Sequence, residues 1–210
     1  MTGPISGPPA RPDAPAGAVR PGRRWLPAGL VALVMAATVL GGFVVAGALP
    51  VPDVRALALG GVVTLRPLPG WEVARREDVA LPSPSGGVIR GSFTQLTRGS
   101  GALDVLTLPG FGGASDELAG RYADEVLSFQ LERLSVSDAL DPVTLRSGLE
   151  GVRFGYIGTE PESGGAIEGS VTAAVAATGN AVVFDGWASE GQLELIEDEL
   201  TAMIHTAEVS

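Results

Sequence analysis

Cysteine is absent from all 210 residues of the chain. This absence excludes a disulfide framework, a thiolate metal site and a cysteine nucleophile, and it leaves no thiol that could carry a lipid anchor. The folded part of the protein must therefore be held together by core packing alone.

Lysine is also absent, because all 14 basic residues are arginines, and His205 is the single histidine. A serine hydrolase would need His205 beside a serine and an acid, and the sequence has no G-x-S-x-G elbow to present that serine. We expect His205 at the solvent-facing end of a helix.

The glycine-rich residues 110–115 precede a predicted helix, but without a lysine, and with Asp116 and Glu117 next to them, they are disfavoured as a phosphate site.

No charged side chain occurs between Trp25 and Pro52. As a helix that rises about 1.5 Å per residue, residues 26–49 would extend for roughly 36 Å, which exceeds the ~30 Å of a bilayer's hydrocarbon core. We therefore predict one transmembrane helix at residues 25–49. A cleaved signal peptide is the alternative, because residues 46–48 (Ala-Gly-Ala) resemble a cleavage site, although the apolar run is longer than the ~7–15 residues usual in such peptides.

Arginines flank this helix unequally. Four precede it against a single acid, Asp13, whereas Asp53 and Arg55 cancel after it; the four are Arg11, Arg20, Arg23 and Arg24. The positive-inside rule then places the N-terminus in the cytoplasm and the C-terminal domain outside a single-pass cell membrane protein.

The charge balance also separates two regions. Residues 1–50 carry four arginines and one acid, and residues 51–210 carry the other ten arginines and 23 acids, so the net charges are +3 and −13. We predict that residues 1–24, rich in proline and glycine, are a disordered cytoplasmic tail. The acidic outer part would repel nucleic acid, which is excluded as a partner.

Alternating apolar and β-branched residues, separated by glycine and proline turns, predict strands after a linker at residues 50–60. The predicted strands are residues 61–65, 71–74, 88–96, 103–108, 143–146, 152–158, 168–178 and 180–188. One helix is predicted at residues 115–134 and another after Ser189. The order ββββαββββα predicts an α+β domain at residues 61–210, with a twisted, mostly antiparallel sheet and two packed helices.

Both helices have start signals and apolar stripes. Ser115 is the expected N-cap of the first helix, and Ser189 with Gln192 forms a capping-box pattern before the second. The expected buried stripes are Leu118, Tyr122, Val126 and Phe129 in the first helix, and Leu193, Ile196, Leu200 and Met203 in the second.

Residues 65–73 (LRPLPGWEV) resemble the opening of PsbP-type domains, in which a strand runs into a Pro-Gly-Trp turn. Residues 151–158, the hairpin at 169–187 and the last helix are similar to the closing part of the same α/β/α arrangement. The chain also resembles envelope proteins of high-GC Gram-positive bacteria that carry such a domain without an assigned activity. The resemblance implies a non-catalytic interaction module and carries over no functional residues.

Acidic and aromatic side chains are the remaining candidates for chemistry. Asp138 and Asp141 lie in a loop, and four acids cluster on the last helix: Glu194, Glu197, Asp198 and Glu199. Without a D-x-[DN]-x-[DN]-G loop these are expected to be solvated, and we predict no catalytic, cofactor-binding or metal-binding residue and no cofactor. Trp71 and Trp187 lie at or near the ends of predicted strands and are candidates for the floor of a shared groove or for partial core.

These patterns favour a membrane-anchored, extracytoplasmic, non-catalytic binding domain. Its expected partners are the lipid bilayer, through residues 25–49, and an unknown envelope protein or ligand. Two alternatives remain open. One is a secreted hydrolase that uses paired carboxylates or a metal, and the other is an envelope sensor that acts through its cytoplasmic tail.

Overall fold

The computed structural model describes residues 56–82 and 87–210. The predicted tail at residues 1–24 and the predicted transmembrane helix at 25–49 lie outside the described residues. Within the described ranges, no helix has both the length and the apolar character needed to cross a bilayer.

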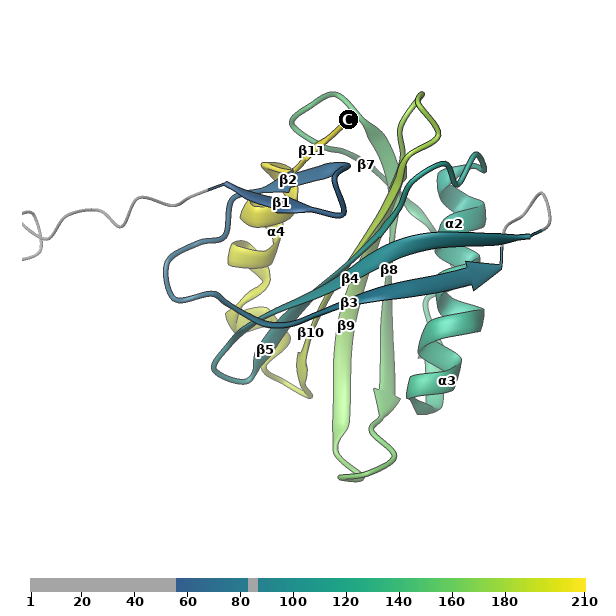
Figure 1. Cartoon of the computed structure of the whole chain (residues 1–210). Helices are drawn as coiled ribbons and strands as arrows, with labels where there is room; N and C mark the ends of the chain where they lie inside the picture. Colours follow the sequence, from purple (N-terminus) through teal and green to yellow (C-terminus); the bar gives the residue numbers. More distant parts are fainter. Residues whose placement is uncertain (1–55, 83–86) are drawn as a thin grey trace, which may run out of the picture. The chain divides into compact units, whose positions relative to one another are not determined.

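A large antiparallel sheet forms the centre of the described part of the chain (Figure 1). Its eight strands are β3 (Glu72–Pro82), β4 (Val88–Arg98), β5 (Gly101–Leu108), β6 (Glu132–Val136), β7 (Asp141–Thr144), β8 (Glu150–Thr159), β9 (Ala166–Val175) and β10 (Ala181–Ser189). They lie in the order β3-β4-β5-β10-β9-β8-β6, and β7 pairs with β8. Strand β10 therefore lies beside β5 in the middle of the sheet, although β6 to β9 separate the two in sequence.

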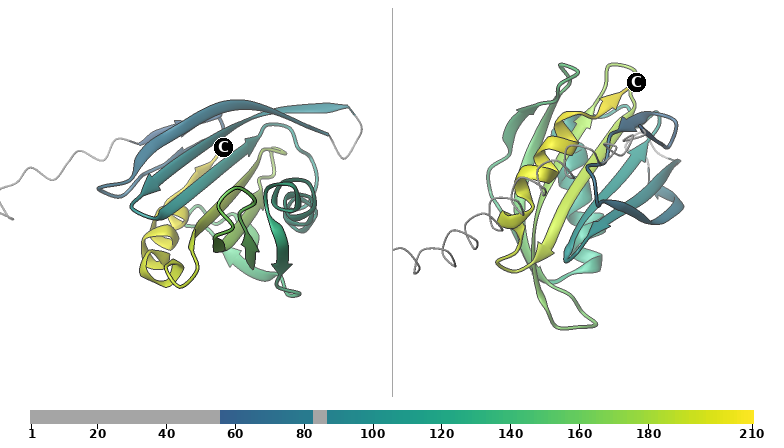
Figure 2. Two further views of the ribbon diagram at one scale, coloured as in Figure 1. Left: turned by 90° about the horizontal axis from the view of Figure 1, so that it is seen from below. Right: turned by 90° about the vertical axis from the view of Figure 1, so that its left-hand side faces the viewer.

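Helices cover both faces of this sheet (Figure 1, Figure 2). Because side chains alternate along a strand, β10 packs Val183 into one apolar core and Phe184 into another. We call the two sides the α2 face and the α4 face. The helical elements are α2 (Ser115–Tyr122), the π-helical turn η2 (Ala123–Leu127) and α3 (Ser128–Gln130) on the first face, and α4 (Glu197–His205) on the second.

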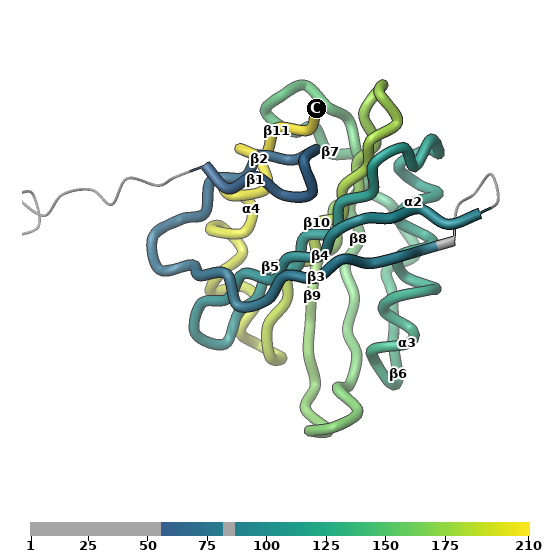
Figure 3. The backbone as a smooth tube through the Cα atoms, in the orientation of Figure 1, coloured from purple at the N-terminus to yellow at the C-terminus, as the bar shows by residue number. Residues whose placement is uncertain are grey.

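A second, three-stranded sheet adds to the core on the α4 face, and Figure 3 shows its strands next to α4. It consists of β1 (Leu57–Leu59), β2 (Val63–Leu65) and β11 (Glu208–Val209), in the order β1-β2-β11. The sequence predicts a linker at residues 50–60, and β1 corrects its last part. Gly60 and Gly61 adopt positive φ angles of 55° and 72°, which lets β1 fold back onto β2.

The first soluble helix ends earlier than predicted. Helical residues stop at Gln130, four residues before the predicted end, and Glu132–Val136 forms the unpredicted strand β6. Leu131, the next residue, is already extended, with φ and ψ of −123° and 138°. Tertiary pairing of β6 with β8 has overridden the local preference for helix.

The π-helical turn changes which apolar residues of this helix are buried. A π turn holds more residues than an α turn, so the side chains that follow it are rotated relative to an uninterrupted α-helix. Leu118 and Tyr122 are buried as predicted, but beyond them Leu127 is buried in place of Val126, and Phe129 is 89% exposed.

The predicted N-cap of the first helix is wrong. Ala114 occupies the cap position, and the hydroxyl of Ser115 accepts a hydrogen bond from the backbone N–H of Val175 at 3.2 Å. Ser115 therefore ties the start of α2 to strand β9.

The capping box of the second helix is also wrong. Gln192 donates its backbone N–H to the carbonyl of Ser189 in a turn, a 3₁₀ turn η3 (Leu193–Leu195) follows, and α4 starts only at Glu197. Leu200 and Met203 are buried as predicted.

The α+β class with a mostly antiparallel sheet and two packed helices is confirmed. The predicted order ββββαββββα lacks the short strands β1, β6 and β11. Each of these is stabilised by partners that are distant in sequence, which a local pattern does not reveal.

Candidate functional site

Two aspartates meet in the middle of the large sheet, on its α2 face. Asp104 of β5 and Asp185 of β10 are direct cross-strand partners, and both are buried, with 8% and 2% of their surface exposed. Side chains at such paired positions have Cβ atoms about 4.5–5.5 Å apart. The crossing of the chain from β5 to the far edge and back therefore brings two carboxyl groups together.

Asp185 accepts hydrogen bonds from two tyrosines on different elements. Tyr122 of α2 donates to its Oδ2 and Tyr156 of β8 donates to its Oδ1, each at 2.9 Å. Gly169 of β9 makes room for this arrangement, because a Cβ there would lie only 2.3 Å from the Tyr156 ring. The helix, the sheet and the missing side chain together fix both oxygens of Asp185.

Asp104 is bound in a similar way by two uncharged donors. Gln95 of β4 donates to its Oδ1 at 2.9 Å, and the indole N–H of Trp187 in β10 donates to its Oδ2 at 3.0 Å. Both donors lie on the same face of the sheet as Asp104, on the two strands that flank β5.

All four donors are neutral, so neither carboxylate has a cation within hydrogen-bond distance among the described residues. Burial, followed by the charge of neighbouring Asp104, raises the pKa of Asp185 to about 7. Burial also raises the pKa of Asp104, although Trp187, Gln95 and the positive charge of Arg75 act to lower it. Burial thus raises the pKa of both carboxyls, and two adjacent carboxyls of this kind titrate as a coupled pair.

A cleft of about 470 Å³ opens over these aspartates. Its floor is the α2 face of the sheet, where Asp104, Asp185, Tyr156 and Trp187 lie. The other lining residues come from β3 and β4, from the end of the helical segment, and from β9 with the loop before it: Arg75, Phe93, Gln95, Leu127, Gln130, Leu131, Glu160, Pro161, Glu162 and Ile167. This volume lies within the range of about 300–1,000 Å³ that is typical of small-molecule sites.

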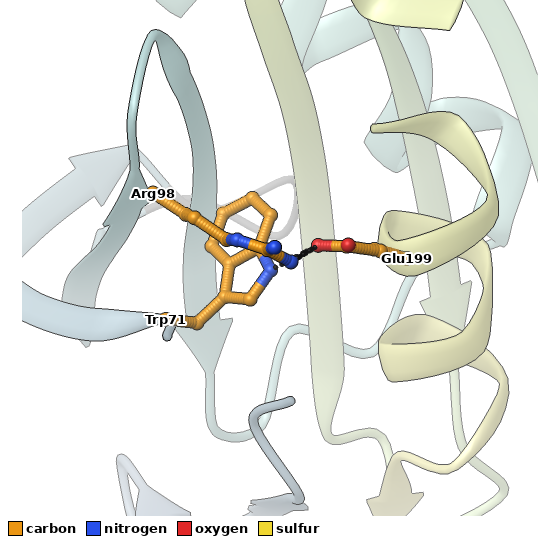
Figure 4. Close-up of polar contacts among 3 residues, drawn as sticks. All are labelled: Trp71, Arg98 and Glu199. Atoms are coloured by element: carbon orange, nitrogen blue, oxygen red, sulfur yellow. Dashed lines mark hydrogen bonds and ion pairs between the residues drawn. The ribbon is translucent and has the colours of Figure 1, made fainter. Parts of the chain in front are cut away.

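Trp71 and Glu199 belong to a different environment on the α4 face. Glu199 of α4 accepts a hydrogen bond from the Trp71 indole at 2.9 Å and forms an ion pair with Arg98 (Figure 4). The Trp71 and Arg98 bonds hold the pKa of Glu199 below its usual value. The expected shared groove of Trp71 and Trp187 is wrong, because the two indoles lie on opposite faces of the sheet.

The other sequence candidates lie apart from the cleft. His205 is exposed at the last residue of α4, as expected, and Asp138 and Asp141 are exposed near β7. Within residues 56–82 and 87–210, no group of three or more histidine, cysteine, aspartate or glutamate residues is placed to hold a metal ion.

The glycine-rich residues before α2 pack against the β9–β10 hairpin. Gly110 donates its N–H to the side-chain oxygen of Asn180 at 3.2 Å, and Gly112 donates to the carbonyl of Gly179 at 3.2 Å. These two amides already bond to the hairpin, so they are not free to bind phosphate.

Asp104 and Asp185 were not among the sequence candidates. The available signal was an acid placed inside an apolar strand, in LDVLTL at residues 103–108 and in VVFDGW at residues 182–187. A buried charge without a partner is costly, so such an acid indicates a hydrogen-bonded site.

No protein-family model matches this chain, and a search of curated proteins finds no significant match. The PsbP-type resemblance stays a prediction.

Proposed function

We propose that the C-terminal domain is a non-catalytic binding domain and that its ligand is a small molecule held in the cleft over Asp104 and Asp185. The observation that carries this proposal is the pair of buried carboxyls at the floor of a cleft of about 470 Å³. Buried ionisable groups destabilise a fold. Those with raised pKa values are therefore concentrated at functional sites, where they serve another purpose.

Binding is favoured over catalysis by the way the carboxyls are held. Every carboxylate oxygen of the pair is fixed by a neutral donor from the protein, and Asp185 is 2% exposed. Such a group is well placed to orient a ligand by accepting hydrogen bonds, and it is poorly placed to attack a substrate.

The cellular setting is part of the same proposal. Residues 25–49 would anchor the protein in the cell membrane as a single helix, with the tail at residues 1–24 in the cytoplasm and the acidic domain outside. Activity of a reporter fused after Ser210 only in the extracytoplasmic space supports this topology. A mature protein in the medium with an N-terminus near Leu49 would instead support the cleaved signal peptide.

Blocking the cleft tests the binding proposal. Gln130 lines the cleft and is exposed, so Gln130→Trp fills the cleft from its wall, whereas Gln192→Trp adds the same ring at an exposed position outside it. The full-length chain is purified gently from its native membranes, and the small molecules that accompany it are identified by mass spectrometry. We expect one compound to accompany the unchanged chain and Gln192→Trp but not Gln130→Trp. Identical sets of compounds in all three preparations would contradict the proposal.

Acid/base hydrolysis is a second candidate, favoured by one observation. Burial raises the pKa of Asp185 to about 7, a value suited to a general acid at neutral pH. Turnover of a panel of glycosides and esters by the full-length chain, abolished by Asp185→Asn and retained by the control Asp138→Asn, would replace the binding proposal. Turnover that is absent or unaffected by Asp185→Asn removes this candidate.

A further inference from the structure

We infer that the ligand of the cleft is an organic cation, a small molecule that carries an ammonium group next to an apolar or aromatic portion. This inference rests on the proposed function and adds the chemical class of the ligand. It is carried by the charge, the hydrogen-bonding capacity and the walls of the cleft, taken in turn.

Negative charge exceeds positive charge around the cleft. Four acids line it, two at the floor and two in the loop between β8 and β9: Asp104, Asp185, Glu160 and Glu162. Among the residues that the structure describes, Arg75 is the one basic residue of the lining, and it is already engaged, because its Nη2 donates to Glu77 at 2.6 Å and its guanidinium lies 5.9 Å from the centre of the Phe93 ring. An entering cation would balance the excess charge, whereas an anion would increase it.

The floor of the cleft offers hydrogen-bond acceptors, and residues 56–82 and 87–210 place no free charged donor there. Each oxygen of Asp104 and Asp185 accepts one hydrogen bond from the protein, and a carboxylate oxygen has the capacity for two. An ammonium group supplies three N–H donors and a positive charge, which is what this pair lacks. Hydrogen bonds with an ionised donor or acceptor are about twice as strong as those between neutral groups, and an ammonium group adds the attraction of opposite charges.

The walls of the cleft suit an organic ligand better than a bare metal ion. Aromatic rings of Phe93, Tyr156 and Trp187 line it together with the apolar side chains of Leu127 and Ile167. Aromatic faces attract cations, and apolar side chains shield the carbon portion of a ligand from water. In the described part of the chain the two carboxyls are not joined by a third acid or histidine of the kind that a metal ion needs.

Three probes of one shape and different charge test the inference. They are 2-phenylethylamine, 2-phenylethanol and 3-phenylpropanoate, and calcium chloride serves as the metal probe. Binding of each to the full-length chain in a non-ionic detergent is measured by titration calorimetry at a pH of about 8, which lies above the pKa of about 7 of Asp185 and at which the amine is charged.

Three variants locate the binding. Asp104→Asn keeps the shape of the side chain and removes its charge, Gln130→Trp blocks the cleft, and the exposed Asp138→Asn is the matched control. We expect the amine to bind at least about tenfold more tightly than the alcohol or the acid, the ratio given by about 1.4 kcal/mol. Asp104→Asn and Gln130→Trp should each weaken amine binding by at least about tenfold, and Asp138→Asn should leave it unchanged.

Every other outcome overturns the inference, and the outcomes separate it from the proposed function. If the alcohol or the acid binds as tightly as the amine and Gln130→Trp abolishes that binding, the cleft binds ligands but the assigned class is wrong. The same holds if calcium alone binds and Asp104→Asn abolishes it. If the amine binds equally well to Gln130→Trp, or does not bind at millimolar concentration, the inference is wrong. The proposed function itself fails only if the compounds that accompany the chain are also insensitive to Gln130→Trp.

Discussion

The two faces of the sheet hold carboxylates in opposite ways. On the α4 face, Glu199 is paired with Arg98 and the Trp71 indole, and its pKa is lowered (Figure 4). On the α2 face, Asp185 is buried beside Asp104 with neutral donors only, and its pKa is raised to about 7. A carboxylate with a counter-charge favours folding, whereas one kept without a counter-charge lowers the stability of the fold when it ionises.

This difference assigns separate roles to the two faces. The α4 face is filled by α4, the small sheet and their shared apolar core, so its ion pair sits at the rim of a closed structure. The α2 face is only partly covered, because the helical segment stops at Gln130 and the cleft opens next to it. The costly carboxyl pair therefore lines an open cleft, as the proposed binding function requires, because a binding site gives up stability for function.

The largest expected effect is a pH dependence of stability from Asp185. Its pKa is about 7 in the folded chain and 3.8 when unperturbed. Between these values the folded protein holds a proton that the unfolded chain has released, so the free energy of unfolding falls as pH rises from about 4 to 7 and is constant above. The expected loss is on the order of 4 kcal/mol, at about 1.4 kcal/mol per pKa unit.

Urea unfolding of the full-length chain and of Asp185→Asn at several pH values measures this loss. The groups that face Asp185 are Asp104, Tyr122 and Tyr156, with Arg75 acting on Asp104. Asp185→Asn should flatten the decrease, and the exposed Asp138→Asn should retain it. Equal slopes for Asp185→Asn and the unchanged chain would show that Asp185 does not carry the effect.

The next effect concerns the tyrosine donors. Tyr156→Phe removes one hydrogen bond to Asp185 and leaves its Oδ1 buried without a protein donor. Hydrogen bonds to charged groups contribute about 1.5–3 kcal/mol and those between neutral groups about 0.5–1.5 kcal/mol, so the loss should be larger at pH 8 than at pH 5. Burial and the nearby carboxylates raise the pKa of Tyr156, so its hydroxyl stays protonated at both pH values.

Chemical denaturation at the two pH values checks this prediction. The control is Thr178→Val in the β9–β10 turn, because it also removes a hydroxyl, one that is exposed and donates at 3.4 Å to the carbonyl of Ser210 rather than to a carboxylate. A loss for Tyr156→Phe that is equal at both pH values would mean that the charge of Asp185 is not what the hydroxyl stabilises.

A comparison of two glycines isolates the space that Tyr156 needs. A Cβ on Gly169 would lie 2.3–2.5 Å from three atoms of the Tyr156 side chain, whereas a Cβ on Gly155 would meet one atom, at 3.8 Å. Gly169→Ala should therefore destabilise the domain by about 1–3 kcal/mol, the usual cost of overpacking, and Gly155→Ala should be close to neutral. Thermal unfolding of the two variants measures the difference. Similar melting temperatures would show that Tyr156 is free to move, which would weaken the account of how Asp185 is fixed.

Alternation and turn chemistry in the sequence predict seven of the eight strands of the large sheet, including the β9–β10 hairpin closed by Gly179 at a φ of 84°, although β3 runs to Pro82 and not only to residue 74 as predicted. The same patterns fail for β6 and for the end of the first helix. There, pairing with β8 and a π-helical turn decide the outcome, and both depend on tertiary contacts. Phe129 illustrates the limit. It follows Val126 by three residues in the predicted apolar stripe, and this spacing predicts burial. The extra residue of the π-helical turn rotates the side chains that follow it, and Phe129 is exposed.

The candidate site is harder to predict than the fold. Tyr122 is expected in the core from its spacing, and the spacing does not say that its hydroxyl reaches Asp185. Asp104 and Asp185 become neighbours only through the order β5-β10 of the sheet, which follows from no single segment. The sequence does contain two acids, Asp104 and Asp185, that each lie inside an apolar strand, which is unusual.

The smallest effect is expected on the α4 face, and it has the opposite pH sense. Arg98→Met keeps the apolar stem of the side chain and removes the ion pair with Glu199. The side chains of Arg98 and Glu199 are 44% and 30% exposed. Partly exposed ion pairs contribute about 0–1 kcal/mol and are screened by salt, so the loss should be small and should shrink as salt is added. Because the pKa of Glu199 is lowered, its contribution is present above the pKa of the unfolded chain and is lost as pH falls. The free energy of unfolding of Arg98→Met should therefore differ from that of the unchanged chain at pH 8 and approach it at low pH.

Asp185→Asn should behave in the reverse way, changing the pH slope between about 4 and 7 with little dependence on salt, because its carboxyl is buried. If both variants show the same salt and pH dependence, the two faces do not differ in the way that their hydrogen bonds indicate.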